Sequence, residues 1–316
     1  MKQPLVILSG PTACGKTSLS IALAKRINAE IISADSMQVY RGFDFGTAKV
    51  TEAEKEGIPH YLIDELDPAE EFNVFEFQSR ARNYICDITS RGKIPMIVGG
   101  TGFYIQSVLY DIDFSEESED KTYRHELEKT AIEKGNDFLY QKLLECDPDA
   151  AKEIHPNNRK RVIRALEYFH ETGQQISEHN RIQHMKESPY NFAYFVLNRP
   201  RNILYERINQ RVDQMIKDGL TEEVSGLLKK GYGEDLLSMQ GLGYKEMVPY
   251  VKGNMTMEEA TDLLKKNTRH FAKRQITWFK REKDVIWIDL ETYASTEDAL
   301  EYMVQVVKEK NIVCLS

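Results

Sequence analysis

Short apolar runs alternate with longer amphipathic stretches over the first hundred residues. The runs at 5–8, 30–36, 60–64 and 94–98 have the length and composition of buried strands. Helical spacing follows the first run, and residues 75–90 form the clearest helical segment between the others. Strands separated by helices need crossover connections, so the pattern predicts a doubly wound parallel sheet. Functional residues are then expected at the carboxyl ends of the strands.

The character of the chain changes near Asp111. Residues 111–120 carry six acidic side chains and no basic one, which is typical of a solvated linker. From 123 to about 184 the pattern is helical, with helix starts expected at Asp147-Pro148 and His155-Pro156 and a stop at Gly173. We therefore interpret residues 112–190 as a helical insert, and residues 1–111 with 191–316 as the α/β core.

The strand pattern returns after the insert, at 192–197. Helices are then predicted at about 201–218, 221–230 and 257–281. A late strand at 285–288 and a final helix near 296–310 complete the core. The sequence shows no internal repeat and no low-complexity tract.

Composition narrows the class of protein. The chain has 316 residues, of which 41% are hydrophobic and 29% charged, as in soluble globular proteins. No apolar run approaches the roughly 18 residues of a membrane span, and the first run reads as a core strand rather than a signal peptide. The four cysteines (Cys14, Cys86, Cys146, Cys314) form no C-x-x-C pair, which predicts a reducing, cytoplasmic setting without a zinc site or disulfide framework.

Residues 10–17, GPTACGKT, match the phosphate-loop pattern G-x-x-x-x-G-K-T between a strand and an Ala/Leu-rich helix. Its glycines turn backbone N–H groups around an anion, and the helix N-terminus adds partial positive charge. Lys16 supplies a charge for phosphate oxygens, and the Thr17 hydroxyl can join a Mg²⁺ shell. The motif predicts a diphosphate or triphosphate site formed by Gly10, Pro11, Thr12, Ala13, Cys14, Gly15, Lys16 and Thr17.

Asp35 ends the second predicted strand and should face the phosphate loop across the site. A carboxylate there could hold Mg²⁺ through water or take a proton from an incoming nucleophile. It could also serve only as a helix N-cap, because Ser33, Asp35 and Ser36 are all capping types. Residues 36–42 add amide and aromatic groups suited to reading a base edge.

The second acid expected of a Mg²⁺-dependent nucleotide hydrolase is not evident. Residues 61–65 imitate an apolar run that ends in acids, but the run is short. The strand at 94–98 leads into Gly99-Gly100-Thr101-Gly102 and has no acid. This glycine-rich turn could bring backbone close to a ligand with Thr101 as a polar contact, or could be a simple strand-to-helix turn.

Two basic clusters oppose the net charge of −8. Residues 155–164 contain four Lys/Arg and no acid, and the apolar face of their helix is expected to be Val162, Ile163, Leu166 and Phe169. Residues 265–283 contain eight Lys/Arg and one Glu, interleaved with Phe271, Trp278 and Phe279. Such runs can be plain solvated surface. Their aromatics, in an otherwise acidic chain, favour a track for a polyanion.

Arg207 and Arg211 lie four residues apart on a predicted helix and share one face. Surface pairing with Glu206 or Asp213 is the simpler interpretation for Arg207. An arginine that enters a phosphate site from beyond the core acts as a charge clamp. Arg211 is the preferred candidate for that role.

The stretches 10–17, 32–49, 97–109, 157–167, 208–224, 239–246 and 268–281 together resemble the tRNA dimethylallyltransferase (tRNA isopentenyltransferase) family. They span nearly the whole chain in order. Without the C-terminal zinc-finger extension of eukaryotic members, the sequence is most similar to the bacterial form. The resemblance implies a P-loop NTPase-like α/β fold, Mg²⁺ as cofactor, and dimethylallyl diphosphate and the tRNA anticodon stem-loop as partners, with no membrane or protein partner. The dimethylallyl group would go to the exocyclic amine of the adenosine 3′ of the anticodon, in tRNAs that read codons beginning with U.

The resemblance also implies residue roles. The phosphate loop would hold the diphosphate, with Thr17 on the metal, Asp35 as general base, and Thr101 and Arg211 contacting substrate or leaving diphosphate. The insert would grip the anticodon stem-loop. The residues expected to contact tRNA are Asp35, Ser36, Met37, Gln38, Thr101, Arg124, Arg159, Lys160, Arg161, Val162, Ile163, Gln240, Gly241, Leu242, Gly243, Tyr244, Lys245, Lys273, Arg274, Gln275, Trp278 and Lys280.

Other functions remain open at this stage. A kinase could use the same phosphate loop, with Asp35 activating an acceptor hydroxyl, but would leave both basic clusters unexplained. A nucleotide-switched RNA-binding module would bind ATP or GTP tightly and hydrolyse it slowly. An adenylate isopentenyltransferase would share the chemistry but would not need the basic insert helix.

Overall fold

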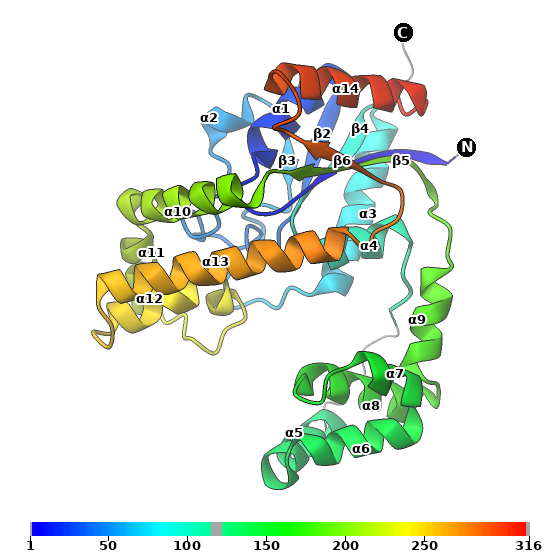
Figure 1. Cartoon of the computed structure of the whole chain (residues 1–316), viewed down its shortest axis with the longest axis vertical. Coiled ribbons are helices and arrows are strands. Elements are labelled where there is room, and N and C mark those ends of the chain that lie inside the picture. The colour runs from blue at the N-terminus through cyan, green and yellow to red at the C-terminus, as the bar shows by residue number, and fades with distance from the viewer. Residues whose placement is uncertain (1, 115–121, 314–316) are drawn as a thin grey trace. The chain divides into compact units, whose positions relative to one another are not determined.

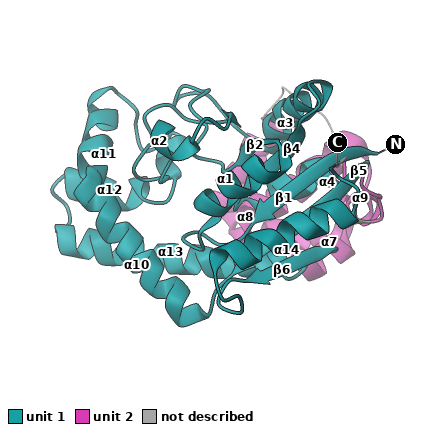
Figure 2. Ribbon diagram, turned by 90° about the horizontal axis from the view of Figure 1, so that it is seen from above, with its two compact units in different colours: residues 1–109, 189–316 teal, residues 110–188 magenta. Residues whose placement is uncertain are grey.

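The structure is a computed structural model that describes residues 2–114 and 122–313. The chain forms two compact units, the first made of Met1–Leu109 with Pro189–Ser316 and the second of Tyr110–Ser188 (Figure 2). The boundaries expected from the sequence are close to these, at 1–111, 112–190 and 191–316. Part of the acidic stretch 111–120 falls on residues 115–121, outside the described residues.

A six-stranded, all-parallel sheet forms the centre of the first unit, in the order β3-β2-β4-β1-β5-β6 (Figure 1). This confirms the predicted parallel, doubly wound sheet. Its register places Ser9 of β1 beside Gly99 of β4, and Gly99 beside Ala34 of β2, so the three strands end in one row. The strands are β1 (Gln3–Ser9), β2 (Ala29–Ala34), β3 (His60–Tyr61), β4 (Ile94–Gly99), β5 (Tyr190–Asn198) and β6 (Val285–Asp289).

Both faces of the central strands are buried, as a parallel sheet requires. In β1, Val6 and Leu8 join one large apolar cluster while Leu5 and Ile7, equally buried, point to the other face. Helices supply the cover: α1 packs on α14, and α3 packs on β2, β4 and α4. The bounds of these helices are α1 (Lys16–Ile27), α3 (Val74–Ser90), α4 (Gly102–Leu109) and α14 (Thr296–Glu309).

A group of helices between β5 and β6 forms the rest of this unit. The expected helices at 201–218, 221–230 and 257–281 are observed, and α10 and α13 pack side by side (Figure 1). A helix at 244–251 was not predicted, because Pro249 lies inside it and glycines precede it. These helices are α10 (Arg201–Asp218), α11 (Leu220–Lys229), α12 (Tyr244–Val251) and α13 (Met257–Phe279), with a 3₁₀ turn at Ser238–Gln240.

The predicted strand at 60–64 is shorter than expected. Only His60 and Tyr61 pair with β2. Leu62 and Asp64 adopt left-handed backbone angles, with φ of 60° and 56°, which end the strand. After this turn Asp64 N–H donates to Gln38 O at 3.1 Å, so the segment packs along residues 37–40 instead. A short helix, α2 (Glu52–Lys55), precedes β3.

The second unit is helical in its described residues, with a small core of its own. Asp147 caps α7 and Gly173 ends α8, as predicted. The predicted start of α8 at Pro156 is wrong: residues 155–158 form a turn in which Asn158 N–H donates to His155 O at 2.8 Å. The helices are α5 (Thr122–Lys134), α6 (Asn136–Cys146), α7 (Pro148–Glu153), α8 (Arg159–Thr172) and α9 (Ile176–His184).

The structure also bears on membrane-spanning helices and on the state of the cysteines. None of their helices is long and apolar enough to cross a membrane. Cys14, Cys86 and Cys146 are free thiols, and Cys314 lies outside the described part of the chain.

Candidate active site

The phosphate loop, residues 10–17, connects β1 to α1, which begins at Lys16. Gly10, Ala13 and Gly15 have positive φ angles of 144°, 62° and 106°, so the loop curls back on itself. Gly10 is also sterically required, because a Cβ there would lie 2.7 Å from Leu197 O. Together with the N-terminus of α1, this loop has the geometry of an anion-binding cradle.

Cationic side chains hold the carbonyl groups of the loop. Lys16 Nζ donates to Gly10 O at 2.9 Å and Pro11 O at 2.8 Å. Arg207 Nε donates to Ala13 O at 2.9 Å, and Arg199 Nε donates to Cys14 O at 3.1 Å. Since each carbonyl points toward a cation, the N–H group of the same peptide plane points the other way. The loop shape therefore depends on two arginines from beyond β5.

Arg211 enters the same site from the next turn of α10. Its Nε is buried and has no hydrogen-bond partner among the described residues. Burial lowers the pKa of the Arg211 guanidinium, and the charge of Asp35 opposes that shift. Burial likewise lowers the pKa of Lys16, with Arg211 lowering it further. Two desolvated cations side by side are stabilised by an anion bound between them.

The role expected for Arg207 needs correction. Surface pairing with Glu206 or Asp213 was the simpler interpretation, but Asp213 instead pairs with Lys265 at 2.6 Å. Arg207 lies against the phosphate loop and lines the same pocket as Arg211. The spacing of four residues was the signal for this role, and it applied to both arginines.

Asp35 directly follows β2 and lines the pocket. Its Oδ1 accepts a hydrogen bond from Met37 N–H at 2.9 Å, which shapes the turn at 36–39. The carboxylate thus has the local turn-capping contact that the sequence allowed. It also raises the pKa of Arg211 and of Lys16, so it shares one electrostatic environment with both cations.

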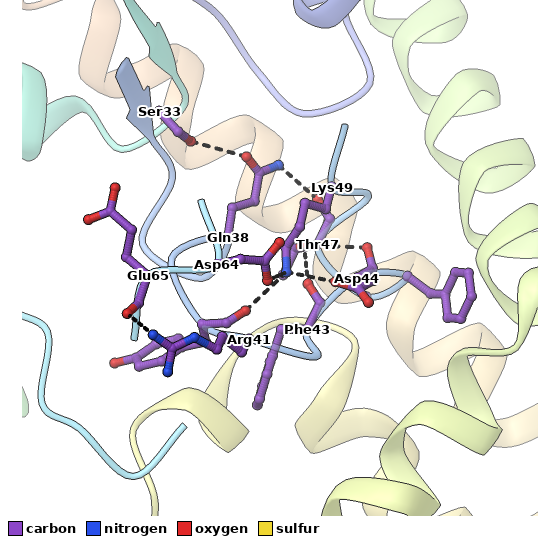
Figure 3. A network of polar contacts seen from close by, with 12 residues as sticks. Ser33, Gln38, Arg41, Phe43, Asp44, Thr47, Lys49, Asp64 and Glu65 are labelled. Atoms are coloured by element: carbon purple, nitrogen blue, oxygen red, sulfur yellow. Dashed lines mark hydrogen bonds and ion pairs between the residues drawn. The ribbon is translucent and has the colours of Figure 1, made fainter. Parts of the chain in front are cut away.

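Gln38 is held in one orientation (Figure 3). Ser33 Oγ donates to its Oε1 at 3.1 Å, and its Nε2 donates to Thr47 O at 3.2 Å. The segment that carries Thr47 is fixed by Lys49, whose buried ammonium bonds Asp44, Asp64 and the carbonyl of Tyr40. This network makes residues 38–49 a rigid wall of the pocket.

The pocket has a volume of about 810 Å³. It brings together residues of the phosphate loop, the segment after β2, the turn after β4, α10 and α13, but none from the 240–245 segment. The predicted site residues that line it are Thr12, Ala13, Gly15, Lys16, Thr17, Asp35, Gln38, Arg211 and Gln275. Ser33, Thr47 and Gln210 line it as well and were not predicted to, and neither were Arg207, interpreted as a surface residue, and Phe271, placed in a basic cluster.

Thr101 follows β4 and lies near the end of β2. Its backbone N–H donates to Ala34 O at 3.1 Å, and its carbonyl accepts from Tyr104 N–H at 3.0 Å, so it starts α4. The neighbouring glycines Gly99 and Gly100 line the pocket. The turn therefore begins a helix and places Gly99 and Gly100 at the pocket, whereas Thr101 is not one of the lining residues, and its contact with a ligand stays a prediction.

The predicted tRNA-contacting residues of the first unit divide by exposure. On α13, Lys273 and Arg274 are exposed and Gln275 is buried, and Lys280, directly after the helix, is exposed. In the 240–245 segment, Gln240 and Lys245 are exposed, while Gly241, Gly243 and Tyr244 are buried and Leu242 is half-buried.

Tyr244 supports the pocket wall. Its ring packs on Phe43 with centroids 4.3 Å apart, and its hydroxyl donates to Glu223 at 2.6 Å. Burial, followed by the Glu223 charge, raises its pKa. The same Glu223 carboxylate accepts backbone N–H bonds from Asp44, Phe45 and Gly46. In this structure the ring and hydroxyl of Tyr244 therefore make contacts that support the pocket wall.

On α8 of the second unit, Arg159, Lys160 and Arg161 are exposed. Val162 and Ile163 are buried in the core of that unit, so their side chains have structural contacts. Phe169, expected on the apolar face, is 37% exposed. Arg124, on α5, makes a bidentate ion pair with the buried Glu167 of α8, at 2.6 and 2.7 Å.

The residues present suit a weakly held Mg²⁺. Thr17 lines the pocket with an exposed hydroxyl in the first turn of α1. No group of three or more His, Cys, Asp or Glu among the described residues is arranged to hold a metal. Mg²⁺ commonly takes only one or two protein ligands and completes its shell with substrate phosphates and water. A Thr17 hydroxyl beside a diphosphate fits that pattern.

The parallel sheet, the phosphate loop and the helix-borne arginines define an α/β phosphate-loop protein. Comparison with known proteins then gives the family. The profile described as "IPP transferase" matches residues 38–282, and one described as "Isopentenyl transferase" matches residues 3–69. The chain belongs to the IPP transferase family.

Curated relatives agree with this assignment. A tRNA dimethylallyltransferase of Lachnoclostridium phytofermentans is 59% identical over 98% of this chain and 99% of its own length. That of Bacillus subtilis is 54% identical over 92% and 91%. Among solved structures, the Bacillus halodurans tRNA isopentenylpyrophosphate transferase has a TM-score of 0.74 at 45% identity, covering 98% of this chain and 97% of that one. A eukaryotic dimethylallyltransferase acting on tRNA has a TM-score of 0.84 at 30% identity, covering 97% and 80%.

Proposed function

We propose that this protein transfers the dimethylallyl group of dimethylallyl diphosphate to the N6 amine of adenosine 37 of tRNA, 3′ of the anticodon, and releases diphosphate. The substrates would be tRNAs that read codons beginning with U. The transfer of a dimethylallyl group to tRNA is the activity for which its curated relatives are named. The observation that supports the chemistry is one pocket that contains two desolvated cations and a carboxylate, Lys16, Arg211 and Asp35.

The diphosphate would bind in the phosphate loop. Gly15 and Lys16 open α1, so their backbone N–H groups face the anion at the helix N-terminus. Lys16 would exchange its loop carbonyls for phosphate oxygens, and Arg211, whose Nε has no hydrogen-bond partner among the described residues, would form a charge-assisted bond to the same group. Thr17 would help to hold Mg²⁺ against the diphosphate, and the chemistry that the ion would supply there is further neutralisation of the leaving-group charge.

The transfer breaks the bond between the allylic carbon and the diphosphate oxygen and forms a bond between that carbon and adenine N6. Negative charge grows on the leaving oxygen, where Lys16 and Arg211 stabilise it. The amine loses one proton, which the Asp35 carboxylate accepts. No phosphoryl group is transferred, and therefore no second metal-binding acid is required beside Asp35.

The two basic surfaces would serve tRNA binding. The exposed Lys273 and Arg274 on α13, Lys280 directly after it, and Arg159, Lys160 and Arg161 on α8 would contact the backbone of the anticodon stem-loop. Adenosine 37 must leave its stack to reach a pocket at the strand ends. Such an enzyme would work in the cytoplasm, where its tRNA substrate is found.

The deciding experiment incubates the purified protein with Mg²⁺, labelled dimethylallyl diphosphate and an unmodified tRNA transcript. Label on the adenosine 3′ of the anticodon, absent from a transcript with guanosine there, is the expected result. Label on free AMP but not on tRNA would favour an adenylate isopentenyltransferase. ATP turnover without any label would favour a kinase and leave both basic surfaces unexplained.

A further inference from the structure

Three glycines, one at the end of β4 and two directly after it, are required by close contacts and not by backbone angles. Gly99, Gly100 and Gly102 all lack the positive φ that favours glycine. A Cβ on Gly99 would lie 2.2 Å from Ala34 O. One on Gly100 would lie 2.1 Å from Gln275 Nε2, and one on Gly102 would lie 2.1 Å from Trp278 Cδ1. Two of the three glycines therefore make room for side chains of α13.

Gln275 connects two loops that are far apart in sequence. Its Oε1 accepts a hydrogen bond from Thr12 N–H of the phosphate loop at 2.9 Å. Its Nε2 donates to Gly100 O of the glycine-rich turn at 3.0 Å. The residue is only 6% exposed. Both ends of its carboxamide are thus used inside the protein, between the loop that receives diphosphate and the turn that carries Thr101.

We propose that Gln275 is a positioning residue that fixes the phosphate loop relative to the Thr101 turn. This inference rests on the proposed function, since it concerns the distance between the diphosphate site and the adenine site. The hydrogen bond from Thr12 sets the direction of one loop peptide, and the bond to Gly100 sets that of the turn. Reacting groups misplaced by about 1 Å can lose roughly 100-fold in rate, so such a bridge would matter for turnover.

The helix that carries Gln275 also carries part of the proposed tRNA surface. Gln275 is flanked on α13 by the exposed Lys273 and Arg274, and Trp278 packs on Gly102 one turn later. The helix that would bear RNA backbone contacts is therefore the same element that locks both loops. Gln275, also expected to contact tRNA, lies on the inward side of that helix, where it lines the pocket.

The first test compares Gln275→Leu with the matched variant Gln305→Leu. Leucine keeps the approximate volume of glutamine and removes both hydrogen bonds. Gln305 lies on α14, where its amide bonds Glu309 within the same helix. For Gln275→Leu we expect kcat/KM for dimethylallyl diphosphate to fall roughly 10- to 100-fold, with stem-loop affinity unchanged within about twofold. Gln305→Leu should behave as the unsubstituted protein. A loss of stem-loop affinity with unchanged KM for the diphosphate would overturn the proposal in favour of a direct tRNA contact.

The second test is a double-mutant cycle of Gly100→Ala and Gln275→Ala. Since position 100 has no backbone need for glycine, the cost of an alanine there should come from the Gln275 amide. Gly100→Ala should impair kcat/KM in the native background and add little once Gln275 is alanine. Fully additive losses would reject the bridge.

The two tests separate this inference from the proposed function. Affinity for Mg²⁺-pyrophosphate, measured by calorimetry, reports on the phosphate loop whether or not tRNA is prenylated. Gln275→Leu should weaken that affinity while its melting temperature remains close to that of Gln305→Leu. If the unsubstituted protein transferred no dimethylallyl group, the proposed function would fail. The same double-mutant cycle, measured by affinity for Mg²⁺-pyrophosphate instead of kcat/KM, would still decide the role of Gln275. Unchanged pyrophosphate affinity in Gln275→Leu would reject that role.

Discussion

The ring of Tyr244 occupies the space that any side chain at position 46 would need. A Cβ on Gly46 would lie 2.5 Å from Tyr244 Cε2, and Tyr244 itself is completely buried. Tyr244 also donates to Glu223, which binds three backbone N–H groups at 44–46. The close approach of Gly46 and Tyr244, together with the bonds of Glu223, therefore holds the pocket wall against α11 and α12.

Gly46→Ala should destabilise the protein by about 1–3 kcal/mol, because overpacking forces either the ring or the wall to move. Urea unfolding measures the change. Gly226→Ala is the matched control: Gly226 lies inside α11 with nothing within 4 Å of its Cβ position. That control should gain roughly 0.5–1 kcal/mol from helix propensity. Equal effects of the two substitutions would show that the contact at Gly46 is not tight.

Hydrophobic patterning predicted the elements that depend on local sequence. The helix at 201–218 has the expected bounds, and Gly173 ends α8 because its backbone is left-handed there, with φ of 68°. The strand at 60–64 was overestimated because the positive φ angles of Leu62 and Asp64 arise from packing against residues 37–40. Tertiary contacts of this kind do not produce a periodic hydrophobic pattern in the sequence.

The site was predictable where a motif carries the chemistry, as in residues 10–17 and Asp35. The contacts of Arg207 and Gln275 were not, since their partners in the phosphate loop lie 194 and 263 residues away in the sequence. On α10 the four-residue spacing places Arg207 on the same face as Arg211 but does not reveal its contact with the loop, and on α13 nothing in the local sequence marks Gln275 as a bridging residue. Charge patterning located the basic helices but could not tell which of their residues face inward.

Asp35→Asn should retain ligand binding and lose most turnover. Asparagine keeps the size of the side chain and an oxygen that can accept from Met37 N–H, but it cannot take the amine proton. We expect kcat to fall about 100-fold or more, with affinities for the stem-loop and Mg²⁺-pyrophosphate unchanged within about twofold. Single-turnover kinetics and calorimetry supply the two readouts, and Asp262→Asn, exposed on α13, is the control.

Two other outcomes for Asp35→Asn would be informative. Surviving turnover would show that the base assignment is wrong. A joint loss of turnover and of Mg²⁺-dependent pyrophosphate affinity would instead place Asp35 on the metal.

Alanine at Arg159, Lys160 and Arg161 together should weaken tRNA binding in a salt-dependent way. These residues are exposed at the start of α8. Each lost phosphate contact should reduce the slope of log affinity against log salt by about one. Binding titrations from low to physiological salt measure that slope. Arg181→Ala, an exposed arginine of α9 paired with Glu178, should leave it unchanged. An unaltered slope in the triple variant would remove α8 from the tRNA surface.

The buried carboxylate of Glu30 gives the fold a defined acid sensitivity. Arg91 binds it with two hydrogen bonds, at 2.7 and 2.6 Å, and Lys93 and the Tyr61 hydroxyl complete the set. The bonds from Arg91, and then those from Lys93 and Tyr61, lower the pKa of Glu30 to about 2, although burial opposes the shift. Because the folded pKa lies below the unfolded one, this stabilisation is complete above pH 4.5 and is lost as the pH falls toward 2.

Glu30→Gln should therefore lower the free energy of unfolding at pH 7 by about 2–3 kcal/mol, a figure reduced for the partial exposure of Arg91 and Lys93. The difference from the unsubstituted protein should shrink as the pH is lowered from 4.5 to 3. Urea unfolding at several pH values measures it. Glu301→Gln, which removes an exposed pair with Arg26, is the control and should have little effect at any pH. A stability difference that stayed constant from pH 7 to pH 3 would mean that Glu30 contributes through packing, because a contribution from its charge must disappear as the carboxylate becomes protonated.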